Sequence, residues 1–169
     1  MAQYGAMLTT WVEKVYPLTT TQRTFINGVG YHDKILFGYA SPTGAWMGLV
    51  TTVVWYLLDD LIEDLNRHYA DNFDRSHQLT NCFIARLMAL LDDGHVQPQT
   101  GEDLPTRAVQ GEALFKQYVR ACRERLSAAN CALLFEMTLI ELSHYDEYYR
   151  TIDSYRKSEF LKIFLFFFY

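Results

Sequence analysis

The stretch Trp55-Tyr-Leu-Leu-Asp-Asp-Leu-Ile-Glu-Asp64 decides how the rest of the chain is interpreted. It completes an apolar run that begins at Trp46 and predicts a buried helix. Four carboxylates arrive within six residues: Asp59, Asp60, Glu63 and Asp64. On a helix, the first and third of these acids are neighbours four residues apart, as are the second and fourth, so all four gather on one side.

This acidic cluster is electrostatically unfavourable at the end of a helix. The C-terminal end of a helix carries partial negative charge, and like charges four residues apart repel by about 0.2–0.5 kcal/mol per pair. A hard divalent cation would neutralise the carboxylates, and Mg²⁺ is commonly held by one or two carboxylates together with substrate phosphates. The residues alone leave two interpretations open, a Mg²⁺–diphosphate site and a solvated acidic helix end.

The motif Asp59-Asp60-x-x-Glu63-Asp64, which follows Trp-Tyr-Leu-Leu, resembles the aspartate-rich motif of class I terpenoid synthases. Its doubled acidic form is similar to that of the trichodiene synthase family of fungal sesquiterpene cyclases. Residues 31–58 and 145–161 also resemble helices of that family. The resemblance implies an all-α fold, the class I terpenoid synthase barrel, with residues 1–169 as a single, partial domain of it.

The resemblance also implies an activity, that of a terpene synthase. Such a lyase uses Mg²⁺ to ionise a prenyl diphosphate, here expected to be farnesyl diphosphate, and releases diphosphate as a cyclic sesquiterpene forms. Bound Mg²⁺ stabilises the charge that develops on the leaving diphosphate. Asp59 is the expected principal metal ligand and forms a catalytic pair with Asp60, while Glu63 and Asp64 complete the expected metal set.

Three further residues are expected to bind the substrate. Trp55 and Tyr56 directly precede the acids, and one of them should form part of the wall of a hydrocarbon pocket, where an aromatic face attracts a carbocation. Lys162 would supply one positive charge to the diphosphate. Arg67, His68 and other basic residues just after the acids are instead expected to be solvated.

The C-terminal part of the sequence departs from the family pattern. The family's second metal motif, Asn-Asp-x-x-Ser-x-x-x-Glu, has no match, and residues 162–169 read Lys-Ile-Phe-Leu-Phe-Phe-Phe-Tyr where the family has an Arg-rich stretch. We therefore expect a truncated barrel whose exposed apolar faces favour association, for example as a homodimer. The alternative function is a non-catalytic helical remnant or interaction protein. A third interpretation is an unrelated helical bundle with solvated acids.

Composition limits the other possibilities. A chain of 169 residues that is 50% hydrophobic predicts one domain with an ample core. The net charge of −5 argues against a nucleic-acid partner. Cys82, Cys122 and Cys131 lack metal-ligand spacing and suggest free thiols in a reducing compartment. Without a signal segment or an apolar run of the roughly 20 residues that a bilayer requires, a cytoplasmic protein with no membrane span is expected.

Helical periodicity extends along most of the chain, and no β-alternation of any length interrupts it. Thr19 to Thr21 and Thr106 are the expected N-caps of two helices. Phosphate-binding glycine loops, Gly-x-Ser-x-Gly and His-Glu-x-x-His are all absent from the sequence. Helices are expected over residues 1–16, 22–39, 45–68, 79–91, 107–128 and 130–150.

Overall fold

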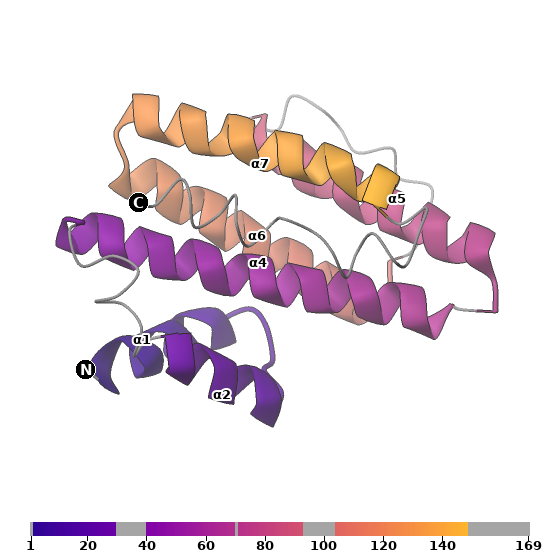
Figure 1. Ribbon diagram of the computed structural model, residues 1–169, viewed down its shortest axis with the longest axis horizontal. Coiled ribbons are helices and arrows are strands. Elements are labelled where there is room, and N and C mark those ends of the chain that lie inside the picture. The colour runs from indigo at the N-terminus through magenta and orange to yellow at the C-terminus, as the bar shows by residue number, and fades with distance from the viewer. Residues whose placement is uncertain (1, 30–39, 70, 93–103, 149–169) are drawn as a thin grey trace.

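The structure, a computed structural model, describes residues 2–29, 40–69, 71–92 and 104–148. These residues form six helices and no strand, which confirms the all-α class. Helix α4 lies in the middle, with α1 and α2 on one side and α5, α6 and α7 on the other (Figure 1). The bounds are α1 Ala2–Glu13, α2 Thr20–Val29, α4 Pro42–His68, α5 Phe73–Leu91, α6 Thr106–Arg125 and α7 Ala128–Tyr148.

A local capping signal fixes the start of helix α4. The Ser41 hydroxyl accepts the Gly44 N–H at 3.1 Å, and Pro42 occupies the first turn, where its missing N–H costs nothing. The helix therefore begins three residues before the expected start and ends at His68, as expected. Arg67 and His68 lie in the last turn, where positive charge complements the helix dipole.

Helix α2 begins with a capping box. The Gln22 backbone N–H donates to Thr19 Oγ1 at 3.2 Å, and the Thr19 N–H donates back to Gln22 Oε1 at 3.0 Å. The expected cap among the threonines is confirmed. The later part of the expected helix, residues 30–39, lies outside the described residues.

The expected start of α5 and the expected N-cap of α6 were wrong. Helix α5 begins at Phe73, six residues before the expected start, because the Asn72 side chain caps it and Ser76 and Thr80 donate to Asn66 on α4. Helix α6 has Pro105 at its N-cap with no side-chain cap bond, so Thr106 is the first helical residue and not the cap. Residues 149–150 of the last expected helix lie outside the described residues.

The apolar part of α4 forms the centre of the core. Leu57, Leu58 and Leu61 are essentially inaccessible, as are aromatic rings of α5 and α6 such as Phe83 and Phe115. By length and composition α4 could cross a membrane, but 72% of its apolar window is buried inside the fold. That burial is typical of the central helix of a bundle. The absence of a membrane span stays a prediction.

A neutral polar seam crosses this core between α4, α6 and α7. The Thr51 hydroxyl donates to the Met47 carbonyl at 2.7 Å and lies 3.4 Å from Tyr118 Oη. Burial, followed by the neighbouring Cys122 thiol, raises the pKa of Tyr118 well above its usual value. Burial also raises the pKa of Cys122 to about 12. The seam is therefore uncharged at neutral pH.

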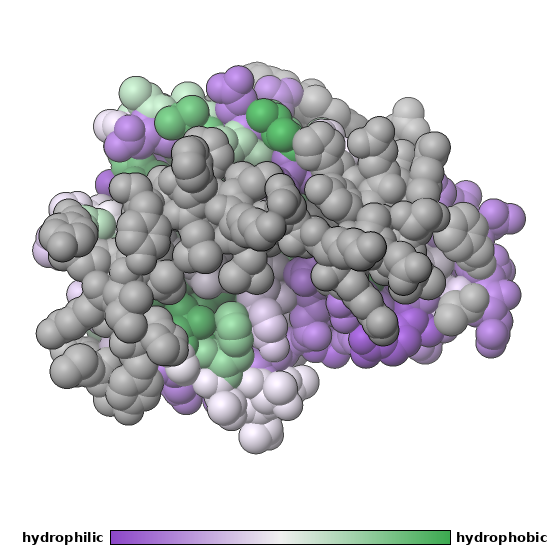
Figure 2. Space-filling view, in the orientation of Figure 1, coloured by the Kyte–Doolittle hydropathy of each residue, from purple (hydrophilic) through white to green (hydrophobic). Residues whose placement is uncertain are grey.

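Helix α7 covers one side of α5 and α6 and leaves apolar side chains outside. Leu133 and Ile140 are 57% and 50% exposed and lie seven residues apart, on the same side of the helix. In Figure 2, hydrophobic residues are visible among hydrophilic ones at the upper edge, where α7 runs, while hydrophilic residues gather around the C-terminal end of α4.

Candidate functional site

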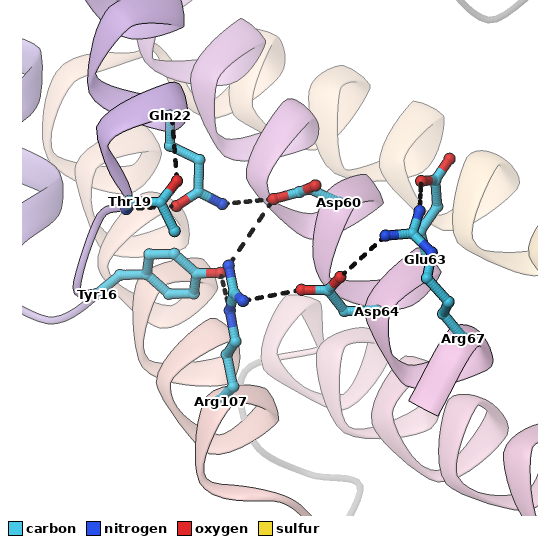
Figure 3. A network of polar contacts seen from close by, with 8 residues as sticks. All are labelled: Tyr16, Thr19, Gln22, Asp60, Glu63, Asp64, Arg67 and Arg107. Carbon is cyan, nitrogen blue, oxygen red and sulfur yellow. Dashed lines mark hydrogen bonds and ion pairs between the residues drawn. The ribbon is translucent and has the colours of Figure 1, made fainter. Parts of the chain in front are cut away.

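Helix α4 carries the four acids near its C-terminal end, and all four are half-buried. Tyr56, Asp60 and Asp64 are spaced by four residues and form one row along the helix. This row faces α2 and α6 (Figure 3). Asp59 and Glu63 form the adjacent row. The motif is therefore divided between two rows with different surroundings.

Asp60 is held by residues from two other helices. The Gln22 side-chain amide donates to Asp60 Oδ2, while its carbonyl oxygen caps the Thr19 N–H. Arg107 Nη2, from the first turn of α6, lies 3.8 Å from the same Asp60 oxygen (Figure 3). One carboxylate oxygen thus faces an amide and a guanidinium at once.

Asp64 lies between two arginines. Arg107 Nη1 donates to Asp64 Oδ2 at 2.8 Å, and Arg67 Nη1 lies 3.6 Å from Oδ1. Arg67 also donates to Glu63 Oε2 at 3.1 Å from an exposed position, so this expected solvated residue is an ion-pair partner as well. Both Asp64 oxygens therefore face positive charge.

Arg107 is fixed in place by Tyr16 as well as by the acids. Its Nε–H donates to Tyr16 Oη at 3.2 Å. Burial alone would lower the pKa of Arg107, but the Tyr16 hydrogen bond and the adjacent Asp64 and Asp60 carboxylates raise it above its ordinary value. The guanidinium is therefore a permanent cation at this site.

Each partner in this ion pair lies near the unfavourable end of its own helix. Asp64 is close to the negative C-terminal end of α4, and Arg107 is in the first turn of α6, at the positive end. Because α6 runs antiparallel to α4, the two ends meet (Figure 1). The pair offsets both unfavourable placements.

A glycine sets how closely α6 approaches α4 at this point. A methyl group at Gly111 would collide with Leu61 Cδ2 and lie 3.3 Å from Phe83 Cζ. Gly111 is one helical turn after Arg107, and Leu61 is three residues before Asp64. The close contact therefore places the arginine within reach of the carboxylate.

The two expected substrate-binding residues on α4 lie in different settings. The Tyr56 ring stacks on Phe25 of α2, with centroids 3.7 Å apart and an interplanar angle of 21°. Burial, followed by the Asp60 charge, raises the pKa of Tyr56. Trp55 is 5% exposed and belongs to the core. Lys162 lies outside the described residues.

The donor chemistry fits a hard cation only in part. Asp60 and Asp64 converge on one positive group, the Arg107 guanidinium, so these two carboxylates are placed to share a cation. Among the residues that the structure describes, no group of three His, Cys, Asp or Glu side chains is positioned to hold a metal ion. Asp59 and Glu63 are not brought to the same point, and the four-acid metal set stays a prediction.

Sequence reasoning missed Tyr16, Gln22 and Arg107. Thr19-x-x-Gln22 is a capping-box pattern that could have marked Gln22 as structured, although not as a partner of Asp60. No local pattern marks Tyr16 or Arg107.

A comparison of the chain with protein-family models, curated proteins and solved structures found no match.

Proposed function

We propose that this chain is a terpene synthase domain of class I type, which binds a prenyl diphosphate through Mg²⁺ held at the acidic end of α4. The observation that carries the proposal is the convergence of Asp60 and Asp64 on a single cation at the end of an apolar helix. An all-helical fold around that helix is compatible with it. Farnesyl diphosphate remains the expected substrate.

In this proposal each part of α4 has a separate task. Asp59, Asp60, Glu63 and Asp64 would hold Mg²⁺, which stabilises the charge on the departing diphosphate. The stacked rings of Tyr56 and Phe25 offer aromatic surface next to the acids, suited to a hydrocarbon chain or a carbocation. Trp55 supports this arrangement from within the core.

Calorimetric titration with inorganic diphosphate, with and without Mg²⁺, tests the site directly. We expect binding only with Mg²⁺, and at least tenfold weaker binding in Asp59→Asn. Asp71→Asn, an exposed acid in the turn after α4, is the matched control and should bind like the wild type. Incubation with farnesyl diphosphate and Mg²⁺, followed by analysis of hydrocarbon products, tests turnover. Metal-independent binding, or equal effects of the two variants, would contradict the proposal.

The exposed face of α7 favours a second candidate, a helical interaction protein. Leu133 and Ile140 expose apolar surface on one side of that helix. Sedimentation velocity would show a concentration-dependent dimer in the wild type and a monomer in the double variant Leu133→Glu, Ile140→Glu. A stable dimer that fails to bind Mg²⁺ and diphosphate favours this function over the cyclase.

A further inference from the structure

We propose that residues 2–29, the N-terminal hairpin formed by α1 and α2, unfold locally as one cooperative unit while α4 to α7 stay folded. This opening uncovers the row of Tyr56, Asp60 and Asp64 on α4. The hairpin opens in the protein without any ligand, so the inference goes beyond the proposed function and does not depend on it.

The two helices of the N-terminal hairpin are joined along one side of α1. Gly5, Thr9 and Glu13 are spaced by four residues and therefore lie on the same side of that helix. A methyl group at Gly5 would lie 3.0 Å from Asn27 Cα of α2, and Glu13 forms an ion pair with Arg23 of α2. Each helix is therefore a main packing partner of the other, and loss of one exposes the other.

The hairpin contacts α4 at the row itself. The Phe25 ring stacks on Tyr56 with a centroid distance of 3.7 Å, and the Gln22 amide donates to Asp60 (Figure 3). Both hairpin residues belong to α2, on the side of α4 that faces away from α5 and α7 (Figure 1). Unfolding of α2 therefore breaks both contacts at once.

Two further hydrogen bonds join the hairpin to α6. Tyr16, in the turn between α1 and α2, accepts the Arg107 Nε–H at 3.2 Å, and Arg107 is paired with Asp64. The Gln117 side chain donates to the Trp11 carbonyl oxygen of α1 at 2.7 Å. Every position of the row therefore contacts the hairpin, either directly or through Arg107.

The helices of the hairpin are short, whereas the remaining helices share a core of their own. Helices α1 and α2 have 12 and 10 residues, and isolated helices shorter than about 12–15 residues are marginal in water. Detachment from α4 and α6 and loss of helix are therefore one event. Leu61 of α4, Gly111 of α6 and Phe83 of α5 contact one another without the hairpin, so this part of the fold keeps its packing.

A buried hydroxyl inside the hairpin favours opening. Thr9 Oγ1 is buried and has no hydrogen-bond partner in the part of the chain that the structure describes. A buried polar group without a partner destabilises the folded state, because water would bond to it in the unfolded chain. Local unfolding returns water to this hydroxyl, so the hairpin opens more readily than its apolar contacts alone would allow.

Hydrogen–deuterium exchange, followed by mass spectrometry at urea concentrations below the unfolding transition, measures opening in the unmodified protein. We expect the hydrogen-bonded amides of α1 and α2 to share one protection factor, at least about tenfold lower than that of the α6 amides. Equal protection of the hairpin and α6 would overturn the inference, because the hairpin would then open only with the whole protein. Unequal protection of α1 and α2 would also overturn it.

Thr9→Val tests cooperativity, because it replaces the unpartnered hydroxyl by a methyl group of similar size. Exchange should slow by about threefold to tenfold in α1 and equally in α2, although the substitution lies in α1 alone. Thr10→Val, at the next and exposed position of α1, is the matched control and should change exchange by less than about twofold. Slowing confined to α1, or equal effects of the two variants, would contradict the proposal.

Ile84→Val tests whether the opening is local. Ile84 is a buried residue of α5, which stays folded in the open state. Loss of one methylene group should speed exchange in α6 by about threefold to tenfold. Exchange in the hairpin should change by less than about twofold, because its opening leaves the surroundings of Ile84 intact. Equal acceleration in both regions would overturn the inference.

Tyr56→Leu tests whether the opening uncovers the row. The substitution keeps an apolar side chain on α4 but removes the ring that stacks on Phe25 of α2. Exchange should become about threefold to tenfold faster in α2 and equally in α1, because the stacked pair is lost whenever the hairpin opens. Unchanged exchange in the hairpin would mean that the row stays covered, which would overturn this part of the inference.

Discussion

Helix α4 contains two polar regions whose side chains find their polar partners in different ways. In its N-terminal half, Thr51 joins Tyr118 and Cys122 in a buried seam of neutral groups. Near its C-terminal end, Asp60 and Asp64 meet Arg107 at a half-exposed edge. The seam has polarity without charge, whereas the edge has charge that needs a counterion.

The difference concerns how freely each region can change its partners. A buried hydroxyl or thiol that loses its partner has no water to replace it, so the seam is fixed. A half-exposed carboxylate can exchange one cation for another with water as an intermediate partner. Binding chemistry is therefore expected at the edge, and resistance to unfolding is expected from the seam and the apolar core around it.

The largest effect on stability should come from a substitution on the buried side of α4. Leu58→Ala removes a side chain with no exposed surface and leaves a cavity in the core. We expect the free energy of unfolding to fall by about 2–5 kcal/mol. Leu133→Ala, at an exposed position on α7, is the control and should cost less than about 1 kcal/mol. Urea denaturation measures both, and similar losses would mean that the core does not centre on α4.

A methyl group added at the close contact between α6 and α4 should have an intermediate effect on stability. Gly111→Ala forces Leu61 to move and should lower the free energy of unfolding by about 1–2 kcal/mol, after the helix-propensity gain of alanine is included. Gly28→Ala has no atom within 4 Å of the added methyl group and should be neutral or stabilising. Thermal unfolding of the two variants compares them. A stabilised Gly111→Ala protein would refute the close contact.

Alkaline pH should weaken the seam. The unfolded chain loses the Cys122 proton near pH 9.0, whereas the folded chain keeps it until about pH 12. Stability is therefore complete below pH 9 and declines above it, by about 1 kcal/mol between pH 9 and 10. In Cys122→Ala this part of the slope should disappear. Urea titrations at several pH values measure it, and identical slopes in the two proteins would contradict the prediction.

The smallest effect on stability should come from the charged edge itself. Arg107→Gln removes one partner of a partly exposed pair and should cost no more than about 1 kcal/mol. The difference from the wild type should shrink between 0.02 and 1 M salt, roughly, because the Debye length falls to about 3 Å. A large, salt-independent loss of stability would instead mean that Arg107 is held as firmly as the buried seam.

The sequence predicted what local patterns encode. The apolar run followed by acids predicted α4 and its end at His68, whereas the cap at Ser41 and Pro42 begins the helix three residues before the expected start. The start of α5 was missed because Ser76 and Thr80 bond to Asn66, a tertiary contact that stabilises a polar first turn. Local propensity contains no information about such a contact.

The sequence predicted the acids of the candidate site but not the residues that pair with them. The acids are adjacent in sequence, so their grouping on α4 could be inferred from helical spacing alone. Their partners come from elsewhere: Gln22 is 38 residues from Asp60, and Arg107 is 43 residues from Asp64. The packing of α2 and α6 against α4 decides which groups pair with the carboxylates. The sequence therefore suggested a metal ion where the structure places an arginine.

The Gln22 side chain makes one hydrogen bond within the cap of α2 and one to the acidic edge of α4. Its carbonyl oxygen protects the Thr19 N–H, while its amide group is held by Asp60. If Asp60 moved away, the Gln22 amide would lose a partner, and we expect the cap on the Thr19 N–H to loosen. We therefore expect the Thr19 amide to exchange with deuterium faster when the contact between Gln22 and Asp60 is broken. This backbone position would then report on the contact between α2 and α4.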